Sequence, residues 1–435
     1  WVQSRVEIKL FDEFNINIST SSDFAYRILP SPHFLIKDPK MLLEDSEKIY
    51  PIADIKNLKV FVSQSNFFDK EKIRINEVII DKANFSLKKN TIKLFNDSSS
   101  NKFSKRKIKI NKSKIFFKDG FNEIISIFKI NNAQLYFDDI KLVNIINFNG
   151  EGFKVPFNLN FENSVNSIND KKINIKAKSL KLDILNQSKK INENLISGQN
   201  TISFLNSKID TQYNIKKKII TFKSEFSKII NSQISYNGKL VVNPFDLNLN
   251  VSLDKYRISE LLNVISVFKE VAQTELLFNE NISIKTSIDL YSNLTKQFFQ
   301  NIKINLNIIN GNINFNNTKL IKKDVGSAEL TNSNLFLENN KLILNTDIEL
   351  KFENIKPLYS ILQTNKKYRK EIKNILVNLD YDLLTNEVIF NRVMVDKNQV
   401  SDQFLTIIQD LGDENFKNLN KSKRALNELF KIYEG

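Results

Sequence analysis

Residues able to carry out chemistry are few and scattered in this sequence. The chain has a single histidine, His33, which stands between Pro32 and Phe34, and no Gly-x-Ser-x-Gly motif accompanies it. A Ser-His-Asp triad needs a histidine held between a nucleophile and a carboxylate, so we expect His33 to be an ordinary residue at a strand edge. The sequence has no cysteine, which excludes disulfides, thiolate metal sites and cysteine nucleophiles.

Two acidic pairs have residue types that suit a hard cation. Asp138-Asp139 and Asp380/Asp382 supply carboxylate oxygens of the kind that Ca²⁺ and Mg²⁺ prefer. Neither pair belongs to a clustered acidic loop, so a turn and a solvated strand face is the simpler interpretation. The Gly-Glu-Gly sequence at 150–152 lacks the rest of a nucleotide-binding motif and is typical of a turn. We therefore expect no catalytic residues, no metal site and no cofactor, and predict that the protein is not an enzyme.

The chain is strongly basic. Lys and Arg number 64 against 49 for Asp and Glu, which gives a formal net charge of +15 at pH 7. Such an excess can attract nucleic acid, but no platform of stacked aromatic and basic residues is visible. The basic run at 102–118 fits an exposed loop that leads into a solvated strand face. We expect solvated lysines, some attraction to anionic lipid headgroups, and no nucleic-acid binding.

Apolar residues alternate with polar ones along most of the chain. Residues 153–161 read Phe-Lys-Val-Pro-Phe-Asn-Leu-Asn-Phe, and runs at 247–253, 302–308 and 342–350 repeat the pattern. Successive side chains of a strand point to opposite faces, so each run predicts a strand with one apolar face. The residues predicted to line that face are Phe153, Val155, Phe157, Leu159, Phe161, Leu247, Leu249, Val251, Leu253, Ile302, Ile304, Leu306, Ile308, Leu342 and Leu344.

The apolar spacing changes from a strand period to a helical one in a few places. Amphipathic helices are predicted near residues 258–277, 355–376 and 401–433, with Pro357 in the first turn of the second. Residues 6–18 alternate and predict a strand or a strand pair. No uncharged stretch of about 20 apolar residues occurs, so no transmembrane helix is predicted.

Asn-rich and Gly-containing links join several of the predicted strands. The links at 119–120, 237–238, 310–311 and 338–341 are hairpin signals, and residues 96–106 predict a mobile loop. Strands and helices do not alternate as in βαβ folds. We therefore predict a mainly β protein with a long, curved antiparallel meander sheet that forms an apolar groove, in the manner of a β-taco.

Parts of the sequence resemble the AsmA-like family. Residues 11–18 (Phe-Asp-Glu-Phe-Asn-Ile-Asn-Ile) and 28–38 (Ile-Leu-Pro-Ser-Pro-His-Phe-Leu-Ile-Lys-Asp) resemble its opening segment, a short strand followed by a Leu-Pro-x-Pro step into a second strand. Residues 237–254, from Asn-Gly-Lys-Leu through Asn-Pro-Phe to Val-Ser-Leu-Asp, resemble its recurring unit of glycine, strand, Pro-Phe, strand and helix. Residues 308–352 resemble its C-terminal part, whereas 51–200 match by pattern alone.

The resemblance implies a function in the Gram-negative envelope. Family members are anchored in the inner membrane, face the periplasm, support outer-membrane assembly and are thought to conduct phospholipids along an apolar groove without catalytic residues. This chain has Ser19 or Thr20 where the family has a glycine, and the usual membrane anchor is expected before Trp1. The implied partners are phospholipid acyl chains and the inner membrane, with the outer membrane as a further candidate; protein partners are left open.

The resemblance also divides the chain into four segments. They are an opening segment at 1–50, β-groove repeats at 51–200, a C-terminal β region with inserted helices at 201–400, and a helical tail at 401–435. Two alternatives stay open, an outer-membrane β-barrel, whose strands also alternate, and a structural or scaffolding envelope protein without lipid transport. A structural β-solenoid would need a fixed repeat period and more glycine, and no fixed period is visible.

Overall fold

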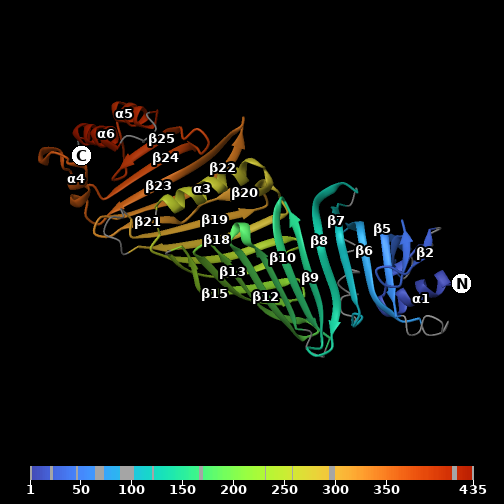
Figure 1. The fold of residues 1–435 in the computed structure, drawn as a ribbon. Helices are drawn as coiled ribbons and strands as arrows, with labels where there is room; N and C mark the ends of the chain where they lie inside the picture. The colour runs from blue at the N-terminus through green and yellow to red at the C-terminus, as the bar shows by residue number, and fades with distance from the viewer. Residues whose placement is uncertain are drawn as a thin grey trace. The chain divides into compact units, whose positions relative to one another are not determined.

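The protein is mainly β in the computed structural model (Figure 1). The structure describes residues 2–19, 23–45, 48–63, 73–88, 102–119, 122–165, 170–230, 232–256, 258–292, 299–413 and 419–433. Within these residues the strands belong to one long mixed sheet of 26 strands. The chain divides into two compact parts, the N-terminal unit (Trp1–Gln212) and the C-terminal unit (Tyr213–Gly435).

The N-terminal unit begins with a helix and continues as strands. Its elements are α1 (Val2–Phe14), β1 (Asn17–Ile18), β2 (Phe24–Arg27), β3 (His33–Lys37), β4 (Lys40–Asp45), β5 (Lys48–Val62), β6 (Ile75–Lys88), β7 (Lys107–Lys118), β8 (Ile124–Asp138), β9 (Val143–Gly152), β10 (Val155–Ser164), β11 (Lys171–Ala177), η2 (Lys178–Leu180), β12 (Leu182–Asn192) and β13 (Leu195–Phe204). Strand β5 pairs with β3, β4 and β6. From β7 to β13 each strand pairs antiparallel with the next.

Helix α1 corrects the prediction of a strand over residues 6–18. Val6, Leu10 and Phe14 are four residues apart, so they lie on one helical face, and all three are buried. They pack in one cluster with apolar residues of β3, β5, β6 and β8. Ile8 and Phe11 point away from this cluster, with 58% and 48% of their surfaces exposed. Val6, Ile8 and Leu10 match a strand period as well as a helical one, so alternation alone could not decide.

The burial of α1 predicts unequal effects for two substitutions in the same helix. Leu10→Ala removes a fully buried side chain and is expected to lower the free energy of unfolding by about 2–5 kcal/mol. Ile8→Ala, at an exposed position, should change it by less than about 0.5 kcal/mol. Urea titration followed by circular dichroism measures both values. Equal effects would show that α1 does not pack on the sheet.

The C-terminal unit consists of the later strands and helices. Strand β14 (Ser207–Lys216) contains the boundary between the units. The elements that follow are β15 (Ile219–Ile229), β16 (Ser232–Val241), β17 (Phe245–Asp254), α3 (Ile258–Gln273), η3 (Leu276–Phe278), β18 (Ile282–Tyr291), β19 (Asn301–Ile309), β20 (Asn312–Asn314), β21 (Thr318–Lys322), β22 (Gly326–Glu338), β23 (Lys341–Phe352), α4 (Lys356–Leu362), η4 (Lys366–Tyr368), β24 (Asn374–Asp382), β25 (Val388–Val395), β26 (Asn398–Gln399), α5 (Asp402–Asp413) and α6 (Leu419–Ile432).

Most pairs in the C-terminal unit are antiparallel neighbours in sequence. Strands β15, β16 and β17 pair in order, as do β22 to β26. Strand β19 pairs with β18 on one edge and with both β20 and β21 on the other. Figure 1 shows α3 lying over this part of the sheet, and Ala272 of α3 is buried in a cluster with residues of β19, β20, β22 and β23.

The mixed sheet corrects the prediction of an antiparallel meander in part. Strands β6 and β7 are parallel, and so are β17 and β18, which are connected through α3 and η3. Parallel neighbours need a crossover connection, and alternation reads the same in either strand direction, so the sequence pattern could not reveal them. The sheet is also classed with the β-solenoids. The missing sequence period did not exclude that class, because backbone pairing can repeat without repeated side chains.

The predicted helices are confirmed in part. Helix α3 occupies most of 258–277, and α5 and α6 occupy most of 401–433. The prediction for 355–376 is wrong beyond its first turns, because α4 ends at Leu362 and β24 begins at Asn374. Gln363 adopts a left-handed conformation that terminates α4. The predicted loop at 96–106 lies outside the described residues up to 101, and the division into four segments stays a prediction.

Two of the predicted glycine turns belong to strands instead. Gly150 and Gly152 lie in β9, and Gly238 lies in β16. The turns at 310–311 and 339–340 are confirmed as links between consecutive strands. A Cβ atom built on Gly238 would lie 2.5 Å from the ring of Phe222 on the neighbouring strand. These glycines therefore let aromatic rings cover the backbone, a use of glycine in strands that resembles a turn signal in the sequence.

Candidate functional site

The single histidine is buried and packs against an aromatic ring. His33 is buried in β3, with 3% of its surface exposed, and its ring stacks on Phe61. Its Nδ1 lies 2.8 Å from the carbonyl oxygen of Ser31. Because a carbonyl oxygen can only accept, a hydrogen bond between these two atoms needs an N–H at Nδ1. The histidine is therefore buried within the N-terminal unit, and the expectation that it is an ordinary residue stays a prediction.

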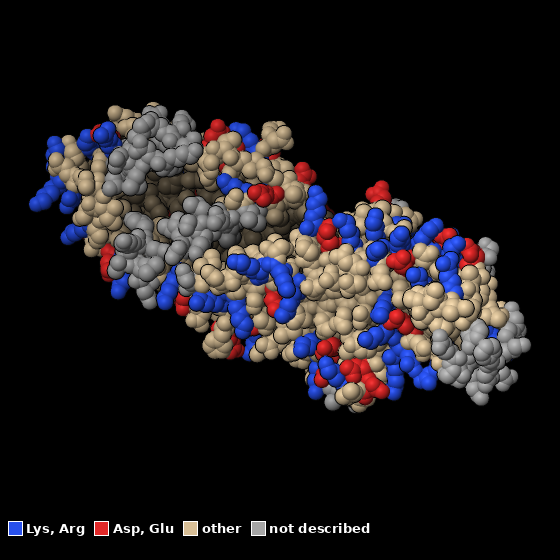
Figure 2. Space-filling view, in the orientation of Figure 1, with Lys and Arg blue, Asp and Glu red and all other residues tan. Residues whose placement is uncertain are grey.

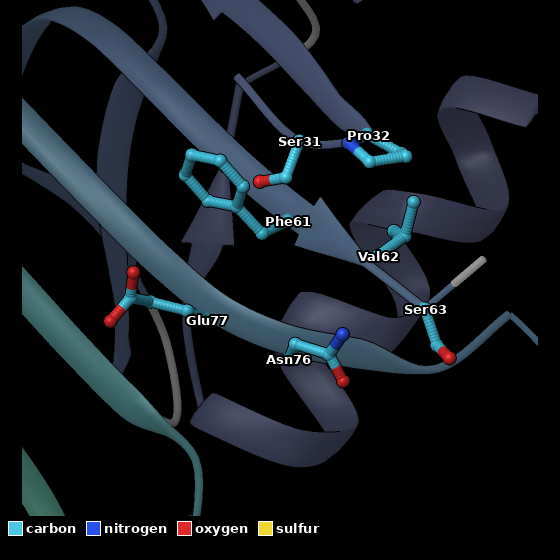
Figure 3. A pocket seen from close by; sticks show the side chains of 7 residues that line it. All are labelled: Ser31, Pro32, Phe61, Val62, Ser63, Asn76 and Glu77. Carbon is cyan, nitrogen blue, oxygen red and sulfur yellow. The ribbon is translucent and has the colours of Figure 1, made fainter. Parts of the chain in front are cut away.

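A pocket of about 880 Å³ lies beside this histidine in the N-terminal unit. Figure 3 shows its polar side chains spread around the pocket rather than converging on one point. Glu77 already pairs with Lys109, whose Nζ lies 2.6 Å from a carboxylate oxygen. The lining residues are Ser31, Pro32, Phe61, Val62, Ser63, Asn76 and Glu77. These side chains do not converge on one point as the groups of a catalytic site do.

The two acidic pairs are engaged by donors from the protein itself. Asp138 accepts hydrogen bonds from the backbone N–H groups of Ile140 and Lys141, and Asp139 pairs with Lys105. The hydrogen bond from Lys105 lowers the pKa of Asp139.

Asp380 and Asp382 are occupied in the same way. Asp380 accepts from the side-chain amides of Asn345 and Asn391, at 2.6 and 2.9 Å. Asp382 accepts from the backbone N–H of Leu384 and from the Thr385 hydroxyl. Among the described residues no group of three or more His, Cys, Asp or Glu side chains is placed to hold a metal ion.

Neighbouring strands of the N-terminal unit carry one apolar row across the sheet. Directly paired residues of adjacent strands share a face, and each pair in this row is apolar. The row, which we call the N-terminal apolar row, consists of Phe24, Ile36, Leu58, Ile80, Ile110, Ala133, Phe148, Leu159, Ile175, Ile184 and Ile202. It crosses strands β2, β3 and β5–β13, so the alternation of each strand adds up to one continuous apolar track.

Coverage of this row changes along the sheet. Ile36, Leu58 and Ile80 are buried in the cluster with α1. From Phe148 to Ile202 the residues of the row are only half-buried, and the four on β10 to β13 belong to none of the hydrophobic clusters among the described residues. One end of the row is therefore core, and the stretch on β9–β13 keeps apolar surface open.

The predicted residues of β10 lie on this open face, with one exception. Val155, Phe157, Leu159 and Phe161 are half-buried on the same side of the strand. Phe153 lies before the strand, in the turn, with φ 51° and 79% of its surface exposed. Its ring still makes an edge contact with Phe128, at 5.7 Å between centroids.

Aromatic rings and glycines together form the floor around β9. Phe148 stacks on Phe157 at 5.4 Å between centroids. A Cβ on Gly152 would lie 2.5 Å from the ring of Phe128, and a Cβ on Gly150 would lie 2.2 Å from the backbone oxygen of Lys129. Both glycines are on the same face as Phe157, so they give the rings room to lie against the sheet.

This floor predicts a difference between two glycine substitutions. The three atoms nearest to a Cβ on Gly152 all belong to the Phe128 ring, so Gly152→Ala should cost about 1–3 kcal/mol of unfolding free energy. Phe128→Ala in the same chain should remove part of that cost. Gly150→Ala meets backbone, so Phe128→Ala should not relieve it. A double-mutant cycle in urea measures the coupling. Coupling of equal size at both glycines would contradict the ring placement.

The C-terminal unit has an equivalent row. Its paired residues, which we call the C-terminal apolar row, are Ile220, Leu240, Leu247, Ile284, Ile308, Ile313, Leu335, Leu344 and Tyr381. The predicted residues Leu247, Leu249 and Val251 are half-buried on β17 and belong to none of the described clusters. Figure 2 shows a recess where Figure 1 draws β22 and β23, and its floor shows no charged side chain among the described atoms.

Other predicted residues of this unit are covered by protein. Ile308 and Leu342 are fully buried in the cluster that contains Ala272 of α3. Ile302 is buried with Tyr256, whose hydroxyl donates to the carbonyl of Phe299 at 2.7 Å. Burial raises the pKa of the Tyr256 hydroxyl. The residues that pack at the margins of these clusters are Leu253, Ile304, Leu306 and Leu344.

Sequence reasoning missed partners of the apolar face on neighbouring strands. Ile175, Ile184 and Ile202 continue the N-terminal row beyond β10. Their strands carry polar residues on the same face, so their alternation is less regular than that at 153–161. Counting pairs outward from each hairpin turn would have found them, because turn position fixes the register.

Comparison with known proteins adds no relationship. No protein-family model matches the chain, and no curated protein matches it. Among the described residues, no helix is both long enough and apolar enough to cross a membrane.

Proposed function

We propose that this protein binds the acyl chains of phospholipids along its apolar rows and thereby supports lipid transfer in a bacterial envelope. The observation that carries the proposal is the N-terminal apolar row, whose stretch on β9–β13 is continuous and only half-buried. Soluble proteins seldom leave an apolar surface of this continuity open unless something binds there. The resemblance to AsmA-like proteins supports a periplasmic location, anchorage to the inner membrane, and a role in outer-membrane assembly.

The size of the open stretch fits an acyl chain. Strands lie about 4.8 Å apart, so the distance from β9 to β13 is roughly 19 Å. One leaflet of a bilayer has a hydrocarbon depth of about 15 Å, half of the full core. An acyl chain lying across the strands would therefore be covered over its length.

The energetics explain why such a surface assists transfer. Exposing an acyl chain to water costs about 0.8 kcal/mol per CH₂, or on the order of 13 kcal/mol for 16 carbons. A floor of Phe, Leu and Ile side chains replaces most of that water. No chemical step is needed for such transfer.

A structural or scaffolding role is the alternative, and a specific observation favours it. Ile308 and Leu342 lie under α3, and α5 and α6 pack on β24 and β25. Part of the apolar face is thus ordinary core. The two roles differ in what covers Leu249 and the open stretch of β9–β13.

Native mass spectrometry of the purified 435-residue chain tests the proposal, with co-purified phospholipid as the expected result. Leu249→Asp should remove the phospholipid bound along the C-terminal apolar row and leave the β circular-dichroism signal unchanged, because Leu249 is half-buried outside the described clusters. Asn250→Asp adds the same charge on the opposite, exposed face of β17 and should keep the lipid. Leu342→Asp buries a charge and should unfold the unit.

Two results would contradict lipid binding. The first is wild-type protein that carries no phospholipid and takes none up from vesicles. The second is Leu249→Asp unfolding the C-terminal unit as Leu342→Asp does, which would place Leu249 in a packed core.

A further inference from the structure

Charged side chains are unevenly divided between the two faces of β9–β13. In these strands the carboxylates are Glu151, Glu162 and Asp183, and by register all three lie on the face opposite the apolar row. The apolar face carries Lys171 and Lys190 and no strand carboxylate. The polar face balances its acids with the lysines Lys172, Lys176 and Lys189. The open apolar face is thus the one with unbalanced positive charge.

Polar residues on the apolar face are gathered at one side of it. Four residues along the strands from the apolar row, Lys171 pairs with Ser188, and Ser188 pairs with Gly198. Two residues along the strands from the row, Asn186 pairs with Asn200. These four side chains are half-buried, as is Gly198.

On the preceding strands, β9 and β10, protein covers the polar residues of this face. Asn144 and Asn163 pair with each other and are buried. The backbone N–H of Phe103 donates to the Asn144 side chain at 2.9 Å, so the segment before β7 lies against β9 here. The polar part of the face is therefore open only over β11–β13.

One polar atom at this place has no partner. The Oδ1 atom of Asn200 is buried and accepts no hydrogen bond. A buried acceptor ordinarily has a donor, and rotation of the half-buried Asn200 side chain would bring this oxygen to a hydroxyl or ammonium group of a ligand. The Lys171 ammonium offers the opposite chemistry, since it donates to phosphate oxygens.

We propose that Lys171, Ser188, Asn186 and Asn200 form a binding site for the phosphate-bearing headgroup of a phospholipid whose acyl chain lies on Leu159, Ile175, Ile184 and Ile202. This inference rests on the function proposed above and adds the position and charge of the headgroup. The polar group lies at the side of the strands that holds Lys171, and the acyl chain crosses β10–β13 along the apolar row. An anionic or zwitterionic headgroup is favoured over an uncharged one, because the face holds lysines and no strand carboxylate.

Binding of fluorescent phosphatidylglycerol and of diacylglycerol with the same acyl chains, both to the full chain, tests the site. Lys171→Gln should weaken phosphatidylglycerol binding about tenfold, the scale of one charge-assisted hydrogen bond, and leave diacylglycerol binding unchanged. Lys172→Gln is the matched control, because it removes the same charge from the opposite face of β11. It should change neither affinity.

The outcomes separate this inference from the proposed function. If both lipids bind and the Lys171 and Lys172 variants behave alike, lipid binding stands and the headgroup site is overturned. If Lys171→Gln weakens both lipids equally, the lysine acts on the fold and the site is also overturned. Binding of neither lipid to the wild type overturns both proposals. Displacement of phosphatidylglycerol by excess inorganic phosphate would mean a free-anion site, which contradicts the commitment to a lipid.

Discussion

The register of the strand pairs is the constraint on which the rest of the structure depends. A slip of one residue would turn every apolar side chain of a strand to the other face. The apolar rows exist because directly paired residues agree in character across many strands. Bulges mark the places where the register shifts, as between Ser224 and Ser227. There the two hydroxyls, 2.6 Å apart, satisfy each other in a buried position.

The polar face helps to hold that register. Lys129 pairs with Glu151 across β8 and β9, and the Asn160 amide donates to Asn147 at 2.6 Å across β9 and β10. Each exposed ion pair contributes little by itself. These pairs instead favour one register over others, because a shifted register would bring like charges or apolar groups together. The lysine-rich composition thus reflects the wet face of the sheet, and its basic excess matters most where lysines lie on the apolar face.

What lies over the apolar face decides whether it is core or binding surface. Helix α1 covers the row at β3–β6, and α3, α5 and α6 cover parts of the C-terminal unit. Between the covered parts of the N-terminal row and its end on β13, the residues of the row are only half-buried. Leu159 and Leu58 are equivalent in sequence pattern, yet Leu58 is fully buried and Leu159 is not.

The sequence by itself determined that the chain is mainly β, where most of its strands lie, and which residues of β10 and β17 share an apolar face. Alternation has a period of two only in strands, so that signal is local and strong. Only the tertiary structure decided that residues 2–14 form a helix, that two pairs of neighbours are parallel, and that Gly150 and Gly238 lie under aromatic rings. It also decided that Ile308 is covered while Leu249 is half-exposed. Coverage and pairing direction depend on residues distant in sequence, whose contacts leave no mark on the local pattern.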